Sequence, residues 1–433
     1  MSAASIAPRR QPALAPSALP RLLAGVRNVG RPVSLQEHLH RHGPLPAHRG
    51  RGPNLGLIGL VEASGLQGRG GASFPTDRKL RAVASAGGRR PVVVVNGAEG
   101  EPISKKDHVL LAYDPHLVLD GAAVAASAVG AGDVFVAVNA STSNALITIQ
   151  RAIDERRGDT VSFRAVRVPD RFVAGEETAL VSLLNGGHAK PTFTPPRPYE
   201  RGVHGAPTLV QNAETLAHLA LIARYGPDWF RGVGTRDQPG SALVTLNGAV
   251  HRPGVYEIPL GLPLRELLEW SGGPRAPLSA YLIGGYFGTW VSAADAESRL
   301  LLDSDLHRVG ATLGARAIFA FPETACGVVE TARLARYLAD ESARQCGPCL
   351  RGLDAIAKAL ERLARANSAD QEPRLPRWLD QVTGRGACRH PDGAVRLVRS
   401  ALHVFSDEYA RHMRGLCSGN GGPLLPTGAR RHR

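Results

Sequence analysis

Short apolar runs alternate with helical stretches through the first half of the chain. Arg90–Asn96 contains four consecutive valines, and a run without polar alternation predicts a strand buried on both faces, as in a parallel sheet. Asp133–Asn139 and Val161–Val168 predict two further strands, with helices expected over Leu117–Val129 and Ala145–Arg156. Strands and helices in this order predict a doubly wound α/β layer.

The pattern changes near Gly240. Ser241–Leu246 and His251–Ile258 predict two strands joined by a turn, and they open a small β-rich domain that holds one short helix. From Val328 onward the apolar positions have a helical period. The expected helices are Val328–Glu341, Gly352–Ala366, Arg374–Val382 and Ala394–His412.

These changes divide the chain into five parts. Residues 1–50 are rich in Pro, Ala and Arg and predict an extended or poorly ordered arm. An α/β domain over 51–239, a small β domain over 240–325 and a helical domain over 326–418 are expected to follow. The basic segment 419–433 is rich in Gly, Pro and Arg and predicts a disordered tail.

A glycine-rich stretch, SGLQGRGGASFPTDRK, begins at Ser64 and ends at Lys79. Glycine carries no Cβ, so Gly68-Arg69-Gly70-Gly71 lets the backbone approach a ligand closely. Successive N–H groups in such a loop form an anion-binding concavity, and Arg69 and Lys79 add cationic donors. A phosphate cradle is the favoured interpretation, and a mobile surface turn is the alternative.

Polar residues follow the valine-rich strand directly, in Asn96-Gly97-Ala98-Glu99-Gly100-Glu101. Ligands of open α/β sheets bind beyond the carboxyl ends of the strands, so this loop marks a candidate site. An ordinary polar turn is the alternative. Gly175-Glu176-Glu177 predicts a helix start with acidic residues in its first turn, and Asn212 to Thr215 leads into another helix.

Three of the five cysteines, Cys346, Cys349 and Cys388, fall in the predicted helical domain. Cys-x-x-Cys with a distant third cysteine fits a redox dithiol, a zinc site with His390 as fourth ligand, or an iron–sulfur cluster. Unrelated buried thiols are a further alternative. A redox dithiol usually belongs to a βαβ setting, which this part of the sequence lacks.

Composition narrows the functional class. The 433 residues carry a net charge of +14, and the first fifty contribute seven Arg against one Glu. Aromatic residues make up 5% of the chain, and no basic helix is interleaved with them, so nucleic-acid binding is disfavoured. No stretch of eighteen uninterrupted apolar residues is present, and no apolar segment follows Arg9-Arg10. We therefore expect a cytoplasmic protein without a signal peptide or spanning helix, able to dock to a larger complex.

Several of these motifs occur together in one order. They are GLQGRGGASFPTDRK, NGAEGEP, AGEETALVSLLNG, GAPTLVQNAETLA, NGAVHRPGVYEIPLG and ESARQCGPCLRG. The chain thereby resembles, from about Ser34 to Cys417, the NADH-oxidising flavoprotein subunit of respiratory complex I and its relatives in hydrogenases and formate dehydrogenases. The resemblance implies a Rossmann-like FMN domain, a soluble-ligand-binding β-grasp domain and a C-terminal helical bundle with a [4Fe–4S] cluster. In that family NADH passes a hydride to FMN, which releases electrons singly to the cluster and on to a ferredoxin-like or other electron-transfer subunit.

The resemblance also implies roles for single residues. The expected FMN phosphate and ribityl contacts are Gly68, Arg69, Gly70, Gly71 and Lys79. The expected lining of the flavin and nucleotide pocket is Asn96, Glu99, Glu101, Gly175, Glu176, Glu177, Asn212 and Thr215, with Glu101 and Glu176 as catalytic carboxylates. Phe74 would stack on the adenine, and Cys346, Cys349 and Cys388 would bind the cluster.

Some positions depart from the family pattern. Ala98 stands where the family has Asp, and Ala82 stands at a stacking aromatic. Thr194 and Arg197 replace an expected Lys and Phe. These changes touch contacts expected to hold NADH and leave most FMN contacts in place.

The family's cysteine run begins at the position of Ala343. Three thiolates could hold a [3Fe–4S] cluster, or a [4Fe–4S] cluster with one iron bound by solvent or another side chain, Cys326 and His390 being candidates. Cys417 matches a near-terminal cysteine of some relatives. The leading hypothesis is an FMN- and iron–sulfur-dependent electron-transfer protein. The contrasting hypothesis is a non-catalytic scaffold or regulatory paralogue that lost NADH oxidation or the cluster, and a zinc-binding module is a third.

Overall fold

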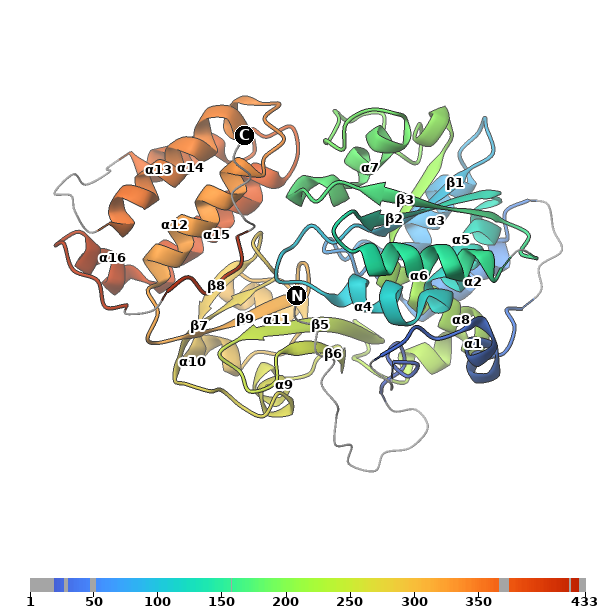
Figure 1. Cartoon of the computed structure of the whole chain (residues 1–433), viewed down its shortest axis with the longest axis horizontal. Coiled ribbons are helices and arrows are strands. Elements are labelled where there is room, and N and C mark those ends of the chain that lie inside the picture. Colours follow the sequence, from blue (N-terminus) through green and yellow to red (C-terminus); the bar gives the residue numbers. More distant parts are fainter. Residues whose placement is uncertain are drawn as a thin grey trace. The chain divides into compact units, whose positions relative to one another are not determined.

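The computed structural model describes residues 19–26, 30–46, 52–156, 158–365, 374–419 and 422–427. The chain divides into two compact units. The first comprises residues 1–100, 105–244 and 255–262, and the second comprises 101–104, 245–254 and 263–433. Figure 1 shows the elements of both units.

The first unit is built on a four-stranded sheet with the strand order β3-β2-β1-β4. Its strands are β1 (Val92–Gly97), β2 (Asp133–Asn139), β3 (Ser162–Val168) and β4 (Thr208–Asn212). All neighbouring pairs are parallel, with Val94 of β1 opposite Phe135 of β2 and Val210 of β4. The prediction of a parallel α/β sheet with buried valines is therefore confirmed.

Helices cover both faces of this sheet. Val93 and Val95 point into a core shared with most helices of the unit, whereas Val92 and Val94 point into a core formed with α7 (Glu177–Leu184). The period of two along β1 explains the division, because successive side chains leave a strand on opposite faces. The helices are α2 (Leu55–Ser64), α3 (Thr76–Ala84), α4 (Lys106–Tyr113), α5 (Pro115–Val129), α6 (Ser143–Asp154), α7 (Glu177–Leu184) and α8 (Ala213–Arg231), with short turns η1 (Phe172–Gly175) and η2 (Val203–Gly205).

The predicted extended arm contains ordered structure. Helix α1 spans Leu35–His42 and begins with a capping box between Ser34 and Glu37. Upstream, the N–H groups of Arg21, Leu22 and Leu23 all donate to the buried carboxylate of Glu257, at 2.8–3.1 Å. The pattern of apolar residues did not show this anchor, because it depends on a glutamate far along the chain. Residues 1–18, 428–433 and part of the remaining predicted tail lie outside the described residues.

A second sheet has the strand order β6-β5-β9-β7-β8. Its strands are β5 (Ser241–Gly248), β6 (Gly254–Pro259), β7 (Leu278–Ile283), β8 (Thr289–Ser292) and β9 (Ala317–Pro322). Strand β5 runs parallel to β9, whereas β7 runs antiparallel to β8 and β9. The short elements between them are α9 (Leu264–Trp270), α10 (Ala293–Glu297), α11 (Asp303–Leu306) and η3 (His307–Val309).

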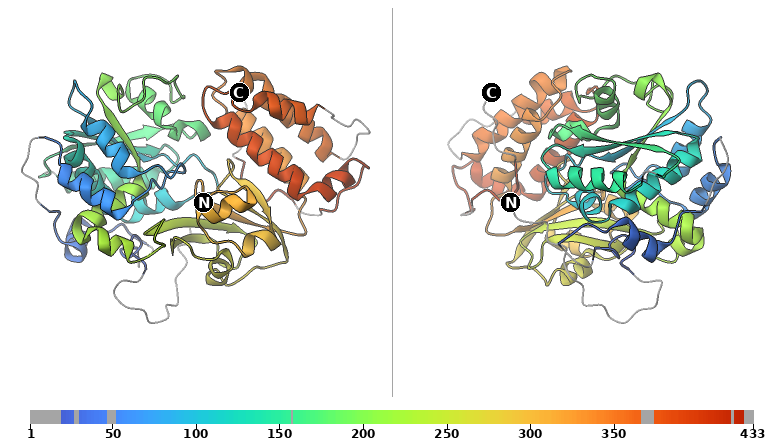
Figure 2. Two further views of the ribbon diagram at one scale, coloured as in Figure 1. Left: turned by 180° about the vertical axis from the view of Figure 1, so that it is seen from behind. Right: turned by 45° about the vertical axis from the view of Figure 1, so that its right-hand side comes forward.

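The C-terminal part of the second unit is helical. Its elements are α12 (Gly327–Asp340), the π-helical turn η4 (Pro348–Gly352), α13 (Leu353–Ala364), α14 (Leu375–Val382), α15 (His390–Val404) and α16 (Ser406–His412). Figure 2 shows the longer of these helices, in orange and red, lying side by side. The sequence predicted one helix over Ala394–His412, and this was wrong. Phe405 leaves the helical conformation and packs its ring on Trp290 and Phe321, which separates α15 from α16.

Among the residues that the structure describes, no single helix is long and apolar enough to cross a bilayer. Helices α4 and α5 pass that test only as a pair, by length and composition, and they are bent by 99° where they join. Both helices contribute to the core of the first unit.

Candidate functional site

The candidate site of the first unit lies where the strand order reverses. From β1 the chain continues to β2 and then β3 on one side of the sheet, and it returns on the other side as β4. Asn96 of β1 and Asn212 of β4 are register partners at the carboxyl ends of these strands. Ligands of open α/β sheets bind in the crevice at such a reversal, so both asparagines lie at the expected position.

The glycine-rich loop connects α2 to α3 and closes on itself. The N–H of Gly68 donates to the carbonyl of Phe74 at 2.8 Å, and the N–H of Thr76 donates to Leu66 at 3.0 Å. Gly71 has φ +111°, a conformation that a side chain would strain. Helix α3 then begins without a side-chain cap, so the N–H groups that follow Thr76 in its first turn, those of Asp77 and Arg78, point toward the side where an anion would bind.

This loop lies against the start of α8. The N–H of Arg69 donates to Thr215 Oγ1 at 2.8 Å. A Cβ on Gly70 would lie 3.2 Å from the Cβ of Asn212. The absence of a side chain at Gly70 therefore allows the loop backbone to lie beside the carboxyl end of β4.

The other predicted side chains of the loop differ in exposure. Arg69 is 1% exposed and its guanidinium donates to the carbonyl of Pro239 at 3.4 Å. Lys79 forms an ion pair with Glu177 at 2.9 Å, which links α3 to α7. Phe74 is 53% exposed, so its ring is accessible for stacking. The contacts of these residues with FMN stay predictions.

The turn before α7 packs against the end of β1. Asn96 Nδ2 donates to the carbonyl of Gly175 at 2.8 Å. A Cβ on Gly175 would lie 2.5 Å from the carbonyl oxygen of Ala98, so this approach requires glycine. Glu176 caps α7 by accepting from the N–H groups of Thr178 and Ala179. Burial raises the pKa of Glu176 above its usual value, although these hydrogen bonds oppose the shift.

A buried charge network supports Asn212. Lys106 Nζ lies 2.9 Å from Asp107 Oδ1, 3.0 Å from Glu214 Oε2 and 3.3 Å from Asn212 Oδ1. Asn212 Nδ2 donates to Asp107 Oδ2 at 2.8 Å, so both ends of the amide are held. Burial raises the pKa of Asp107 to about 6, against the opposing effect of Lys106. This network fixes the orientation of Asn212 at the end of β4.

The two acidic residues of the loop after β1 have different surroundings. Glu99 accepts from the N–H groups of Asp107 and His108 at 3.3 and 3.1 Å, and it thereby caps α4. Glu101 belongs to the second unit, where it accepts from the N–H of Tyr286 at 2.7 Å. The carboxylate of Glu101 lies over Gly285, where a Cβ would approach Oε2 to 2.4 Å.

The residues of the first unit fit FMN. A glycine cradle open to close approach, an uncapped helix start and two oriented asparagine amides suit a phosphate and a polar ring system. Gly68, Gly70, Gly71, Asn96 and Asn212 would hold it.

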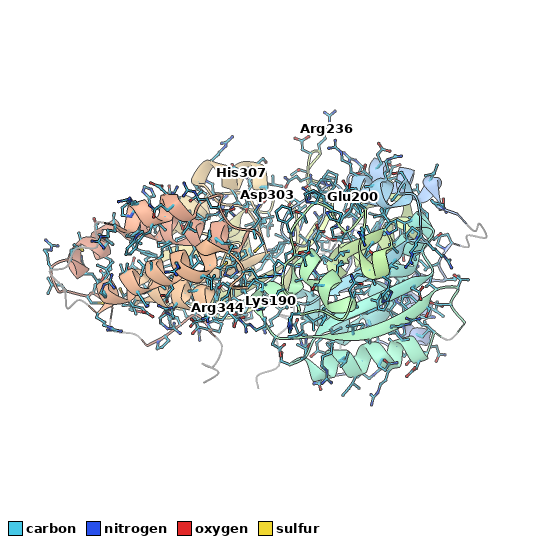
Figure 3. All side chains as sticks on the ribbon, turned by 90° about the horizontal axis from the view of Figure 1, so that it is seen from above. Lys190, Glu200, Arg236, Asp303, His307 and Arg344 are labelled. Atoms are coloured by element: carbon cyan, nitrogen blue, oxygen red, sulfur yellow. The ribbon has the colours of Figure 1, made fainter. Side chains whose placement is uncertain are left out.

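Three cysteines gather around the turn η4. Cys349 is buried, and its pKa is raised to about 12 by burial and by the nearby thiols Cys346 and Cys388. Burial also acts on Cys346, but N–H groups of Ala387 and Cys349 donate to its sulfur and lower its pKa overall. Arg344, labelled in Figure 3, has φ +56°, so the chain turns tightly before Cys346. The segment that follows α12 therefore brings the Cys-x-x-Cys motif to Cys388.

A mononuclear zinc ion would need four ligand atoms around one point. Within the described part of the chain, Cys346, Cys349 and Cys388 do not form such a group. His390, the fourth zinc ligand considered from the sequence, donates from Nε2 to the carbonyl of Leu338 at 2.7 Å.

Family models match three regions of the chain. Residues 61–221 match the Nuo51 FMN-binding domain, residues 243–283 the SLBB domain, and residues 330–412 the NADH-ubiquinone oxidoreductase-F iron-sulfur binding region. An F-type NADH-quinone oxidoreductase subunit of Rhizobium meliloti (strain 1021) is 33% identical over 374 residues, which cover 82% of this chain and 88% of the relative. The corresponding subunit of Mycobacterium tuberculosis (strain ATCC 25618 / H37Rv) is 34% identical over 83% of this chain and 85% of its own length.

The chain belongs to the family of F-type NADH-quinone oxidoreductase subunits. It carries an FMN-binding domain and an iron–sulfur binding region, and it is an electron-transfer oxidoreductase of that family. Among solved structures, the crystal structures of an NAD+-reducing [NiFe]-hydrogenase in the H2-reduced and air-oxidised states match with a TM-score of 0.76 and 28% and 29% identity. They cover 86% of this chain, and the chain spans 64% of the hydrogenase chain.

For a member of this family, the cysteine position taken by Ala343 is the clearest departure. Ala343 is 5% exposed and lies shortly after α12, so the fold keeps this position inside the helical part. Sequence reasoning missed Lys106, whose ammonium holds Asn212. The sequence feature that could have revealed it is the charged pair Lys106-Asp107 at the start of a helix whose other residues are largely apolar.

Proposed function

We propose that this F-type subunit homologue binds FMN in the crevice between β1 and β4 and passes electrons through an iron–sulfur cluster to a ferredoxin-like subunit. The observation that carries the flavin assignment is the placement of Asn96 and Asn212, in register at the strand reversal and beside the glycine loop. FMN, when bound, accepts two electrons as a hydride and releases them singly.

The chain's own residues supply binding and orientation. The N–H groups of Gly70, Gly71 and the start of α3 would hold the phosphate, where the positive end of the helix favours an anion. Asn96 and Asn212 would hold the polar edge of the ring system, each fixed by a partner on its own side of the crevice. A rigid amide needs no reorganisation when a ligand binds, which favours affinity.

We also propose roles for four glutamates, on the resemblance to the family. Glu176 and Glu101 are the proposed catalytic carboxylates, and Glu99 and Glu177 the proposed nucleotide contacts. Support for Glu176 is its raised pKa and its position directly after Gly175, whose carbonyl Asn96 holds. Thr215 would position the loop through the N–H of Arg69.

We propose a nicotinamide dinucleotide as the hydride donor. The curated relatives are named NADH-quinone oxidoreductases, and the matched hydrogenase is named NAD+-reducing. Phe74 offers an exposed ring for the adenine. The changes at Ala82, Ala98, Thr194 and Arg197 remove contacts expected for NADH, so we expect weaker NADH binding than in relatives that keep them.

We propose that Cys346, Cys349 and Cys388 hold the cluster in a [3Fe–4S] form, or in a [4Fe–4S] form with one ligand that is not cysteine. Besides burial, Cys346 and Cys388 both raise the pKa of the Cys349 thiol, which supports the proximity of each to Cys349. The five-part domain division is part of this proposal, with flavin binding in 51–239, a β-grasp domain in 240–325 and the cluster in 326–418.

A paralogue that keeps the fold but has lost NADH oxidation or the cluster is the second candidate, and the buried Ala343 in place of a cysteine favours it. An anaerobic absorbance spectrum of the purified protein, before and after NADH, separates the two. FMN bleaching by NADH, with iron present at about three or four atoms per chain, supports the proposal. If dithionite reduces the bound flavin and NADH does not, the electron donor is a molecule other than NADH. A protein that binds neither FMN nor iron after reconstitution would contradict the proposal and support the second candidate.

A further inference from the structure

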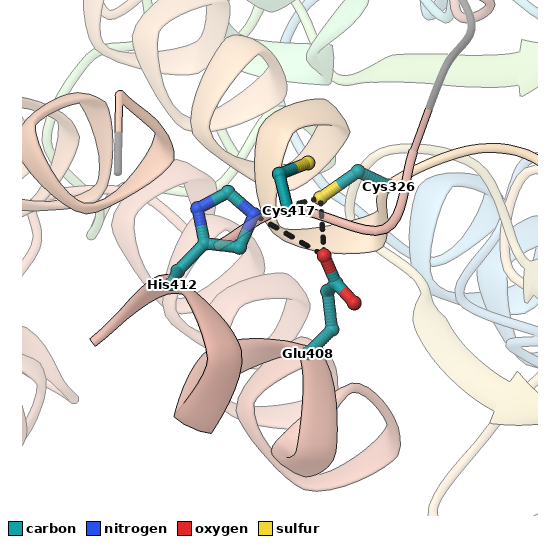
Figure 4. A group of neighbouring side chains, drawn as sticks. All are labelled: Cys326, Glu408, His412 and Cys417. Carbon is teal, nitrogen blue, oxygen red and sulfur yellow. Dashed lines mark hydrogen bonds and ion pairs between the residues drawn. The ribbon is translucent and has the colours of Figure 1, made fainter. Parts of the chain in front are cut away.

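A second group of metal-binding side chains lies apart from the cluster cysteines in sequence. Cys326, Glu408, His412 and Cys417 bring one ligand atom each to within 4.8 Å of all the others. Cys326 Sγ lies 3.2 Å from His412 Nε2 and 3.6 Å from Glu408 Oε1. His412 Nε2 lies 3.3 Å from Glu408 Oε1. Figure 4 shows the four side chains pointing toward one another.

Three segments of the second unit meet in this group. Cys326 is the N-cap residue of α12, Glu408 and His412 share one face of α16 at a spacing of four, and Cys417 follows in the chain after α16. Gly419 lets that chain pass close to α12, because a Cβ there would lie 2.6 Å from the Cβ of Cys326. Cys326 and His412 are buried, whereas Cys417 is exposed.

Surrounding hydrogen bonds orient the ligand atoms. His412 Nδ1 lies 3.0 Å from the carbonyl of Leu363, which can only accept, so Nδ1 carries the proton. In the neutral ring Nε2 is then a bare acceptor, and it faces a sulfur and a carboxylate oxygen. Glu408 is held in turn by the N–H and the hydroxyl of Ser418. Outer partners of this kind are typical of ligands that bind a metal.

We propose that Cys326, Glu408, His412 and Cys417 form a structural zinc site. Two thiolates, an imidazole and a carboxylate are ligands that Zn²⁺ takes in tetrahedral geometry. A tetrahedron with metal–ligand lengths of about 2.0–2.3 Å has edges of about 3.3–3.8 Å. The three measured separations of 3.2, 3.3 and 3.6 Å lie close to that range.

The site is structural because protein side chains take all four positions, whereas a catalytic zinc keeps one position open. The ion would join the start of α12 to α16 and to the chain that follows it. Without a cation, the thiol of Cys326 has one hydrogen, which it donates to Glu408 Oε1. The lone pair of His412 Nε2 then faces a sulfur and a carboxylate oxygen in a largely buried position, which costs free energy. The cluster cysteines are a separate set, Cys346, Cys349 and Cys388.

The test is zinc analysis of the full chain with zinc K-edge X-ray absorption, which is blind to flavin and iron. The protein is purified, dialysed against Zn²⁺ and then against metal-free buffer. We expect one zinc per chain, with two sulfur neighbours at about 2.3 Å and two lighter neighbours at about 2.0 Å. FMN and iron are measured in the same sample.

Variants assign the ion to its ligands. We expect Cys326→Ser and Glu408→Gln to weaken zinc binding by about 100-fold or more, with iron unchanged. Asp407→Asn is the matched control, since Asp407 is the exposed neighbour of Glu408 on α16, and it keeps zinc. If Cys326→Ser fails to fold, Cys417→Ser replaces it, because Cys417 is exposed. We expect Cys349→Ser to lose iron and to keep zinc.

Three results would overturn the site. One is a protein that holds no zinc after dialysis. A second is zinc that survives in Cys326→Ser and Cys417→Ser and disappears in Cys349→Ser, which would place it at the cluster cysteines. The third is a Cys326–Cys417 disulfide, found by mass spectrometry in protein purified without reductant, together with no uptake of zinc after that disulfide is reduced.

Discussion

Asn96 and Asn212 are register partners across the two parallel strands at which the sheet of the first unit reverses its order. Each amide is held from its own side, Asn96 by the carbonyl of Gly175 and Asn212 by Lys106 and Asp107. The pair therefore presents two fixed polar groups at one crevice, beside a loop that has no side chain at Gly70. Fixed polar groups around an open cradle are suited to a flat cofactor with a phosphate.

Gly70→Ala is expected to weaken FMN binding. The added Cβ would lie 3.2 Å from Asn212 and would take space at the cradle, whereas the backbone at this position has no positive φ that alanine would strain. We expect a Kd for FMN about tenfold higher, which corresponds to about 1.4 kcal/mol. Quenching of FMN fluorescence on titration with apoprotein measures it. Gly59→Ala in α2, where a Cβ meets nothing within 4 Å, is the control, and an equal loss there would refute the cradle.

Glu176→Ala is expected to lower the free energy of unfolding by about 1 kcal/mol, because it removes the N-cap of α7. Glu176→Ser keeps a capping oxygen and should stay within about 0.5 kcal/mol of the parent. Glu177→Gln, which breaks only the half-exposed pair with Lys79, is the neighbouring control and should cost less than about 1 kcal/mol. Urea unfolding followed by circular dichroism gives all three values. Equal stability of the alanine variant and the parent would show that the cap contributes nothing.

Ala343→Cys is expected to restore a fourth thiolate to the cluster. Ala343 is buried and three residues before Cys346, at the position where the family's cysteine run begins. For a parent that holds the [3Fe–4S] form, iron should rise from about three to about four atoms per chain. The EPR signal of the oxidised protein should then disappear, because an oxidised [3Fe–4S] cluster is paramagnetic and an oxidised [4Fe–4S] cluster is not. Ala339→Cys, one turn earlier and also buried, is the control. Unchanged iron and an unchanged spectrum in Ala343→Cys would show that this position is too far from the cluster.

Stability should fall as the pH drops below neutrality, partly through His116. Burial, and then the charge of Arg156, lowers the pKa of His116 to about 4 from its ordinary 6.5. Between pH 6.5 and pH 4, His116 is therefore protonated in the unfolded chain but neutral in the folded protein. The stability that neutral His116 contributes is fully present above about pH 6.5 and is lost as the pH falls toward 4. We expect a loss of about 2 kcal/mol, the order of magnitude that a pKa shift of this size implies.

Urea unfolding of His116→Asn at about pH 7 and about pH 4.5 measures this contribution. The variant should lose less stability than the parent between the two pH values. His40→Asn, at an exposed position of α1, should keep the parental pH dependence. A His116→Asn protein with the parent's full pH dependence would assign the effect to other groups.

Local pattern was enough for the elements of the first sheet. Four valines in a row place β1 inside a parallel layer, because such a layer buries both faces of a strand. Local pattern also predicted the loop after β1 and the glycine-rich loop before α3 as candidate ligand-binding segments. The ordered motifs, taken as one resemblance, predicted FMN and the iron–sulfur region, which the family models match.

Other features required contacts between distant residues. The break at Phe405 arises because its ring packs on Trp290, which no helical period shows. Lys106 becomes a support for Asn212 only when α4 and α8 meet the end of β4. The anchoring of Leu22 by Glu257 joins positions 235 residues apart.

The sequence by itself determined the elements, the family and most of the proposed flavin and cluster residues, because these depend on short-range periodicity and on motifs of fixed spacing. The tertiary structure alone decided which polar groups share a crevice and which are used as helix caps, as Glu176 and Glu99 are. It also decided that Cys326, Glu408, His412 and Cys417 meet at one point. Such meetings depend on how helices far apart in the chain pack, and packing is a property of the whole fold rather than of any local pattern.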